Sequence, residues 1–283
     1  RQGCAARVPG AAREAMSSAP PIVLTVAGSD PSGGAGLQAD LKTIHQHGGY
    51  GAAVPTLITV QSTLGVESVE LLSPELLRAQ LSNLLADLRP QAAKTGALGS
   101  RALIEVVGSF MARSEIPWVV DPVWLPSRGQ PLVRGDVVDA YRDTILPHAT
   151  LLTPNALEAG LLTEEPVRTV TEAHAAASRI AQLGAQAVLV KGGHFDGADR
   201  GTDVLFHDGA ITELPEPELA AGDFHGTGCA LSAAIATRLA AGDDIPGAVT
   251  IAKRWLGGAL RDAFAVGEGA MPVNHLFTVD DKP

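Results

Sequence analysis

The chain of 283 residues is 46% hydrophobic and 18% charged, which is typical of a globular protein that forms one large α/β domain or two small ones. A net charge of −10 argues against a nucleic-acid-binding surface, and no apolar run reaches the roughly 18 residues that a membrane span requires. The two cysteines, Cys4 and Cys229, provide no disulfide framework, as is usual in a reducing compartment. We therefore expect a cytoplasmic protein with no nucleic-acid partner and no membrane partner.

Residues 1–20 differ from the rest of the chain. Residues 1–15 are rich in Ala, Arg and Gly without periodicity, and residues 16–21 form a short polar lead into the first apolar run. We expect residues 1–20 to be a disordered extension or leader. The alternative is a targeting peptide, which three arginines favour but Pro9 and the missing amphipathic face oppose.

After residue 20, short apolar runs alternate with helical patterns, which is typical of a mostly parallel sheet with helices on both faces. Ser73 and Pro74 mark one helix start, and Asp208-Gly209 indicates the turn of a hairpin over residues 204–214. No linker interrupts residues 21–270, so we expect one domain there and a C-terminal tail over residues 271–283. The other predicted strands cover residues 22–27, 52–60, 91–95, 118–121, 151–153 and 187–191; the predicted helices cover residues 35–47, 74–88, 102–113, 171–183, 228–241 and 245–264, with one more directly after residue 153.

Several predicted strands end in polar residues, and open α/β sheets bind their ligands at the carboxyl ends of strands. The first strand runs into the glycine-rich loop of residues 28–36, and later strands end at Asp121, at Asn155 and at Lys191. Each of these residues taken alone is explained by a turn or a cap. The repetition of the pattern predicts that these strand ends converge on one site.

The segment Gly226-Thr227-Gly228-Cys229 lies between a polar stretch and the apolar run of residues 230–241, so we interpret it as a glycine loop that opens a helix. Backbone N–H groups at such a helix start form an anion site. The helix N-terminus also lowers the pKa of a thiol, so Cys229 is expected to serve as a base or nucleophile. The alternative is a glycine-initiated helix with a small buried cysteine.

Residues 34–39 match the dinucleotide-binding pattern G-x-G-x-x-A after a strand. A dinucleotide site also requires an acidic residue about 20 positions further on, where this chain has Val60-Gln61-Ser62. No Gly-Lys pair follows a suitable glycine, so a Walker phosphate loop is missing as well. The sequence therefore argues against both kinds of nucleotide site.

Residues 25–43 resemble the opening segment of the hydroxymethylpyrimidine/phosphomethylpyrimidine kinases, which belong to the ribokinase-like superfamily. Asn155 and Glu158 resemble the N-x-x-E element of that superfamily, residues 188–194 resemble its Lys-Gly-Gly-His segment, and residues 225–229 resemble its His-Gly-Thr-Gly-Cys segment. The resemblance spans roughly residues 22–238 in the family's order. It implies a ribokinase-like α/β fold, with a central, mostly parallel sheet and helices on both faces.

The resemblance also implies a kinase of thiamine biosynthesis that uses ATP as co-substrate and Mg²⁺ as cofactor. The acceptors would be 4-amino-5-hydroxymethyl-2-methylpyrimidine and then its monophosphate. Such a transfer depends on positioning and charge neutralisation more than on covalent catalysis. The family further suggests a homodimer.

The resemblance assigns the transfer chemistry to the glycine loop and to the strand ends. The backbone of Gly226, Thr227 and Gly228 would hold the migrating phosphoryl group. Cys229 would accept the hydroxyl proton, at a position where many superfamily members have Asp. Lys191 would neutralise phosphate charge, with a capping lysine as the alternative. The remaining assignments are Asn155 at the phosphates, Glu158 orienting Mg²⁺ through water and Asp121 placing the metal or phosphate, with a helix cap and a turn before Pro122 as their alternatives.

The family's pyrimidine pocket matches a further set of positions. Gln61 carries an amide that can pair with both a donor and an acceptor of an aminopyrimidine, with a polar strand terminus as the alternative. Asp40 can equally be a solvated helix residue. The other matching positions are Gly28, Ala35, Ala97 and Val123.

The chain departs from the family pattern near this pocket. Ala97 stands where the family usually has Met, which enlarges the site, and Trp124 is expected to refill it or to form a different wall. Arg128 is expected either to contact a substrate phosphate or to be a solvated loop residue. Phe224 replaces a small polar residue before His225. These changes bear on the acceptor and on the second phosphorylation.

Two further hypotheses stay open. A pyridoxal kinase would act on a hydroxymethyl heteroaromatic of similar size, and turnover of the two alcohols distinguishes the two kinases. A non-catalytic nucleotide- or pyrimidine-binding sensor of the same fold would bind nucleotide without transferring phosphate. The intact glycine loop, Cys229, Lys191 and Glu158 argue against the sensor.

Overall fold

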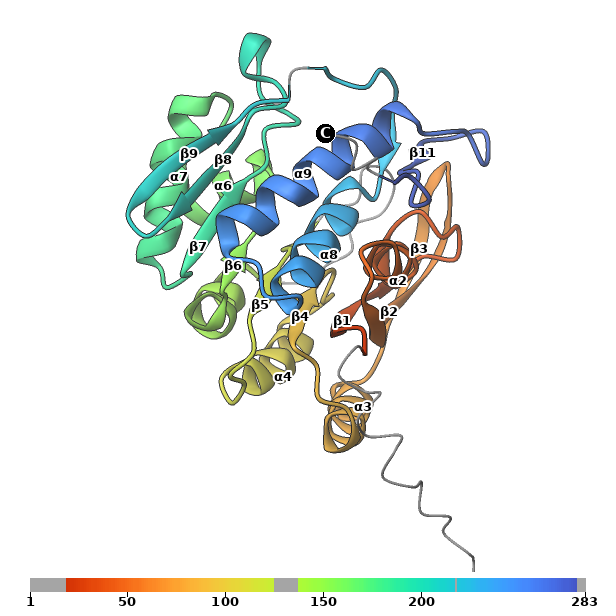
Figure 1. Cartoon of the computed structure of the whole chain (residues 1–283). Coiled ribbons are helices and arrows are strands. Elements are labelled where there is room, and N and C mark those ends of the chain that lie inside the picture. Colours follow the sequence, from red (N-terminus) through yellow and green to blue (C-terminus); the bar gives the residue numbers. More distant parts are fainter. Residues whose placement is uncertain (1–18, 125–136, 217, 279–283) are drawn as a thin grey trace, which may run out of the picture.

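A computed structural model describes residues 19–124, 137–216 and 218–278 of the chain. Within these ranges the centre is a nine-stranded sheet in the order β3-β2-β1-β4-β5-β6-β7-β8-β9 (Figure 1). Neighbouring strands from β2 to β7 are parallel, whereas β3 at one edge and β8 and β9 at the other are antiparallel to their neighbours. The strands are β1 (Ile22–Ser29), β2 (Tyr50–Ser62), β3 (Gly65–Leu71), β4 (Ala92–Thr95), β5 (Trp118–Val120), β6 (Leu151–Leu152), β7 (Ala187–Val190), β8 (Asp203–His207) and β9 (Ala210–Leu214).

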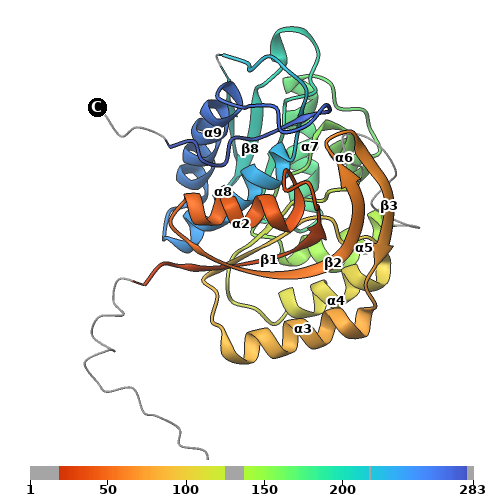
Figure 2. The same cartoon turned by 90° about the vertical axis from the view of Figure 1, so that its right-hand side faces the viewer.

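Helices cover both faces of this sheet because successive strand side chains point to opposite sides. Val23 and Val119 enter the apolar layer on the side of α2, α8 and α9, whereas their neighbours Leu24 and Val120 enter the layer on the other side. Figure 2 shows α2 and α8 on one side of β1, with α3 and α4 on the other. The helices are α2 (Gly36–Gln46), α3 (Pro74–Asp87), α4 (Arg101–Met111), α5 (Val138–Ala140), α6 (Ala156–Thr163), α7 (Val170–Gln182), α8 (Thr227–Ala240) and α9 (Ile245–Arg261).

The predicted α/β class with a mostly parallel, doubly covered sheet is confirmed. Local sequence signals explain why the predicted ends of these helices and strands agree with the observed ones. The Ser73 side chain accepts a hydrogen bond of 3.2 Å from the backbone N–H of Leu76 at the start of α3. Asp208 and Gly209, both with positive φ, form the turn between β8 and β9.

The prediction missed several elements, namely β3, the segment from α5 to His148, the 3₁₀ turn Gly197–Asp199 and the short strands β10 (Phe224–His225) and β11 (Met271–Pro272). Strand β3 pairs antiparallel with β2 at the sheet edge, and it carries Glu67 and Glu70 with no continuous apolar run to reveal it. The segment from α5 through a π-helical turn (Tyr141–Ile145) to a 3₁₀ turn (Leu146–His148) changes its helical pitch twice. It therefore lacks the sustained periodicity on which a helix prediction depends.

The end of the described chain lies against the domain. Strand β11 (Met271–Pro272) pairs in parallel with β10 (Phe224–His225), directly before the glycine loop. The indole N–H of Trp255 donates to the carbonyl of Phe277 at 3.0 Å. The predicted leader lies outside the described residues, apart from its last two positions. Within the described ranges, no helix is both long and apolar enough to cross a membrane.

Candidate active site

A cavity lies where the carboxyl ends of β1, β5, β6 and β7 meet the N-terminus of α8. The predicted convergence of strand ends is therefore confirmed: Lys191 forms an isolated parallel bridge with Asn155 and an ion pair with Asp121. The predicted site residues that line the cavity are Gly28, Ala35, Gln61, Ala97, Asp121, Val123, Asn155, Glu158, Lys191, Gly226, Thr227, Gly228 and Cys229.

The glycine loop and the start of α8 form one wall. Gly226 precedes α8 with φ of 73°, and a Cβ atom there would lie 1.9 Å from the carbonyl oxygen of Gly34, so only glycine fits. No side chain caps α8, which leaves the first N–H groups of this helix without a cap partner. Together with the helix dipole, these N–H groups make the wall a site for anions such as phosphate.

Gly228 faces an ion pair on the neighbouring wall. A Cβ atom at Gly228 would lie 2.8 Å from the Lys191 ammonium nitrogen and 3.1 Å from Oδ2 of Asp121. A side chain at this position would therefore displace the pair. The missing side chain lets the backbone of the loop and the ammonium face the same space.

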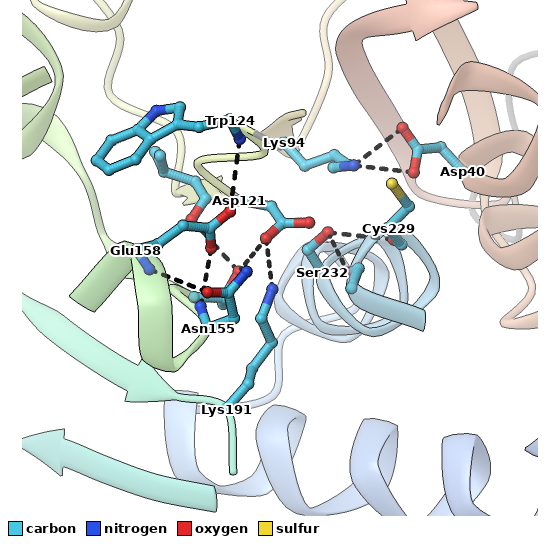
Figure 3. A network of polar contacts seen from close by, with 12 residues as sticks. Asp40, Lys94, Asp121, Trp124, Asn155, Glu158, Lys191, Cys229 and Ser232 are labelled. Atoms are coloured by element: carbon cyan, nitrogen blue, oxygen red, sulfur yellow. Dashed lines mark hydrogen bonds and ion pairs between the residues drawn. The ribbon is translucent and has the colours of Figure 1, made fainter. Parts of the chain in front are cut away.

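Lys191 and Asp121 are held by the ends of β7 and β5. The Lys191 ammonium donates to Oδ1 of Asp121 at 2.6 Å (Figure 3). Burial alone would lower the pKa of Lys191, but the nearby carboxylates of Asp121 and Glu158 raise it above its ordinary value. Lys191 is therefore a permanent positive charge on the cavity wall.

Asn155 and Glu158 form a capping box at the start of α6. The Asn155 side chain accepts from the backbone N–H of Glu158 at 2.9 Å, and the Glu158 carboxylate accepts from the backbone N–H of Asn155 at 2.8 Å. The helix cap that we considered as an alternative is therefore present. Both residues also line the cavity, so the cap fixes two polar side chains at its edge.

The carboxylates of Asp121 and Glu158 provide the donor set for a cation. Oδ2 of Asp121 is buried without a hydrogen-bond partner, which leaves an acceptor available at the cavity wall. Among the described residues, no group of three or more His, Cys, Asp or Glu side chains could hold a metal. Two carboxylates with further ligands from water and phosphate suit Mg²⁺, so the residues present fit that ion.

Cys229 lies in the first turn of α8, where it lines the cavity and is 8% exposed. We expected the helix N-terminus to lower the pKa of its thiol, and this expectation is wrong. Burial raises the pKa of Cys229 to about 11, with Lys94 acting in the opposite direction. At neutral pH Cys229 is therefore mostly a neutral thiol.

Asp40 does not line the cavity, although we expected it in the pyrimidine pocket. It is fully buried and accepts hydrogen bonds of 2.9 and 3.0 Å from the Lys94 ammonium, and one of 2.6 Å from the Thr25 hydroxyl. The alternative of a solvated helix residue is also wrong. A charged pair sealed between β4 and α2 contributes to the site only through its field.

One end of the cavity is mostly apolar. Leu57 and Ala97 belong to a small apolar cluster against which Val123 packs, and all three line the cavity. The Thr59 hydroxyl donates to the carbonyl of Ser29 at 2.9 Å and lies 3.1 Å from the amide oxygen of Gln61. This end therefore offers an apolar surface with an amide at its edge.

Trp124 does not form a wall of the cavity, contrary to our expectation. Its ring is buried and packs edge-on against Tyr141 with ring centroids 5.4 Å apart, pointing away from Cys229 (Figure 3). The space that Ala97 leaves is therefore not refilled by this tryptophan. Arg128 lies outside the described residues.

Sequence reasoning missed two charged residues that shape the site. Asp30 lines the cavity and accepts from the backbone N–H groups of Ser32 and Ala35 at 2.8 Å, which holds the first glycine loop. Its signal was an Asx turn in the segment Asp30-Pro31-Ser32. Lys94 is buried next to the Cys229 helix, and its signal was a lysine inside an otherwise apolar strand.

Comparison with known proteins identifies the family. The phosphomethylpyrimidine kinase family matches residues 30–274. A hydroxymethylpyrimidine/phosphomethylpyrimidine kinase of Mycobacterium tuberculosis is 41% identical over 260 residues, which cover 91% of this chain and 94% of the relative. The chain belongs to the phosphomethylpyrimidine kinase family.

Two solved structures extend this assignment. A phosphomethylpyrimidine kinase from Clostridium difficile has 34% identity and a TM-score of 0.73, over 83% of this chain and 97% of its own. A pyridoxal kinase from Staphylococcus aureus, in complex with AMP-PCP and pyridoxal, has 32% identity and a TM-score of 0.82, over 91% of this chain and 94% of its own. The sequence analysis inferred a resemblance to this kinase family and a ribokinase-like fold class. Both inferences are confirmed.

Proposed function

We propose that the protein transfers the γ-phosphoryl group of ATP to the hydroxymethyl group of 4-amino-5-hydroxymethyl-2-methylpyrimidine, and then phosphorylates the monophosphate. The observation that carries this proposal is the position of the uncapped N-terminus of α8. It lies between the Lys191–Asp121 pair and the apolar end of the cavity where Gln61 stands. The site therefore joins an anion cradle to a pocket of mixed apolar and amide character.

The nucleotide end of the cavity neutralises charge. The N–H groups of Thr227 and Gly228 and the Lys191 ammonium would bind the phosphates, with Asn155 beside them. Mg²⁺, held by Asp121 and Glu158, would supply further neutralisation of phosphate charge when bound. Donors fixed in this way stabilise charge that develops during transfer, because they need no reorganisation at that moment.

Cys229 is our proposed proton acceptor. In the transfer, the acceptor oxygen forms a bond to the γ-phosphorus, the bond from that phosphorus to the leaving ADP oxygen breaks, and the hydroxyl proton passes to Sγ of Cys229. The high pKa of the thiol makes its thiolate scarce but strongly basic. Proton transfer from an alcohol needs a strong base, so the raised pKa suits this role as long as some thiolate forms.

The experiment is a phosphorylation assay with the purified protein, ATP and Mg²⁺, with the pyrimidine alcohol and pyridoxal in parallel, resolved by mass spectrometry. We expect the pyrimidine diphosphate as the main product. Cys229→Ala should lower turnover about 100-fold or more with nucleotide binding retained. Nearly full turnover of the variant would contradict the role of Cys229, and a monophosphate alone would contradict the second step.

Pyridoxal is the second candidate acceptor because the aligned Staphylococcus aureus kinase was solved with pyridoxal bound. Pyridoxal phosphate as the main product would assign this chain to that activity. Nucleotide binding with no product from either alcohol would support the sensor instead. A homodimer and a cytoplasmic location stay predictions from the family resemblance, and light scattering after gel filtration tests the first.

A further inference from the structure

A second lysine–aspartate pair lies beside Cys229, and the transfer chemistry described above does not use it. Lys94 on β4 donates to both carboxylate oxygens of Asp40 on α2, at 2.9 and 3.0 Å, and both side chains are 0% exposed. The Thr25 hydroxyl donates a third hydrogen bond to this carboxylate at 2.6 Å. Taking two charges out of water is costly, so a sealed pair next to a reactive sulfur calls for an explanation.

The pair lies behind the cavity wall, beside the thiol of Cys229. Figure 3 shows the Lys94 ammonium and the Asp40 carboxylate next to Sγ of Cys229, at the start of α8. The other groups that face the sulfur are the backbone N–H of Gly36 on α2 and the carboxylate of Asp121 after β5. Neither Lys94 nor Asp40 lines the cavity, so a bound phosphate does not reach the Lys94 ammonium.

We propose that Lys94, held in place by Asp40, is a positioning residue that stabilises the thiolate of Cys229 by its charge. The proposal rests on the proposed role of Cys229 as proton acceptor. A thiolate beside a triphosphate is repelled by like charge, and Lys191 is already engaged with Asp121 and the phosphates. A second ammonium that the phosphates do not contact remains available to attract the thiolate.

Asp40 has a separate task in this arrangement. Burial alone would lower the pKa of Lys94, and the Asp40 carboxylate raises it above its ordinary value, so the ammonium stays charged. At the sulfur, Lys94 lowers the pKa of Cys229 more strongly than Asp40 raises it. The two members of the pair therefore act on the thiol in opposite directions, with Lys94 dominant.

The pKa of the Cys229 thiol provides the test. In a Cys4→Ser background Cys229 is the sole cysteine, so the pH dependence of its alkylation by iodoacetamide reports the pKa of its thiol. Lys94→Met should raise that pKa and slow alkylation about tenfold at a given pH below it. The double variant Lys94→Met with Asp40→Asn leaves no buried charge without its partner, and it should also raise that pKa, because Lys94 outweighs Asp40 at the sulfur. An unchanged or lowered thiol pKa in these variants would overturn the proposal.

A control variant and a fallback variant keep the result interpretable. Arg238→Met breaks the ion pair of Arg238 with Asp243 at the far end of α8, and it should leave the pKa of Cys229 unchanged. Should Lys94→Met fail to fold, the double variant Lys94→Met with Asp40→Asn alone decides, because an unchanged or lowered thiol pKa in that variant contradicts the proposal.

The alkylation is measured without nucleotide or acceptor. Its result therefore does not depend on whether the proposed acceptor is phosphorylated. Failure of this inference can thus be distinguished from failure of the proposed function. Full turnover of Cys229→Ala together with a raised thiol pKa in the double variant would contradict the base assignment and leave the charge effect intact.

Discussion

Two lysine–aspartate pairs, Lys191–Asp121 and Lys94–Asp40, flank Gly228 and Cys229 at the start of α8. They differ in whether they face the cavity. The Lys191 side chain is 16% exposed toward the cavity, whereas the Lys94 side chain is 0% exposed. Both ammonium groups are kept charged by their carboxylates. An ion pair of this kind can contact a ligand where it opens on a cavity, and it acts only through its field where it is sealed.

The position of each lysine along its strand causes this difference. Lys191 follows the last residue of β7, so its side chain reaches the space beyond the carboxyl end of the sheet. Lys94 lies inside β4 and points into the layer between the sheet and the helices α2 and α8. The position of a lysine along its strand thus separates a charge that faces the cavity from an internal one.

Substitution of the cavity lysine should have the largest effect on activity. Lys191→Met removes the positive charge at the phosphates, and we expect kcat/KM for ATP to fall about 100-fold or more. Initial-rate kinetics with varied ATP measure it. The melting temperature should fall less than in Lys94→Met, since the remaining Asp121 carboxylate borders the cavity whereas Asp40 does not. Turnover close to that of the unchanged protein would remove the basis for treating this pair as the ligand-binding one.

Substitution of the sealed lysine should instead dominate stability. Lys94→Met leaves the Asp40 carboxylate buried without its partner, which should lower the free energy of unfolding by about 3–5 kcal/mol. Urea unfolding measures this loss. The double variant Lys94→Met with Asp40→Asn should recover much of it, because no uncompensated charge is left. An equal loss in Lys191→Met would erase the contrast between the pairs.

The pH dependence of turnover should sharpen the contrast further. Burial raises the pKa of Cys229 to about 11, so the thiolate fraction and kcat should rise about tenfold per pH unit between about pH 7 and 9. Lys94→Met should shift this profile to higher pH, whereas Lys191→Met should lower it at every pH. Cys229→Asp is the control, since a carboxylate is already ionised and should flatten the profile. A flat profile for the unchanged protein would contradict proton acceptance by the thiol.

Much of the site followed from residues close together in the chain. The spacing of Asn155 and Glu158 is enough for a capping box, and Gly226 before an apolar run is enough for an open helix start. Lys191 directly follows a buried strand, which places it at the carboxyl edge of the sheet. These features depend on local backbone geometry, so a single segment determines each of them.

The α/β class, the strand ends that meet at the cavity and the glycine loop could thus be inferred from the sequence. The pairing of Asp40 with Lys94, the orientation of Trp124 away from the cavity and the raised pKa of the Cys229 thiol could be seen only in the folded molecule. Burial and charge proximity depend on every element packed around a residue, and no single segment of the sequence contains that information. Asp40 and Lys94 come from segments that meet only when α2 packs onto the sheet.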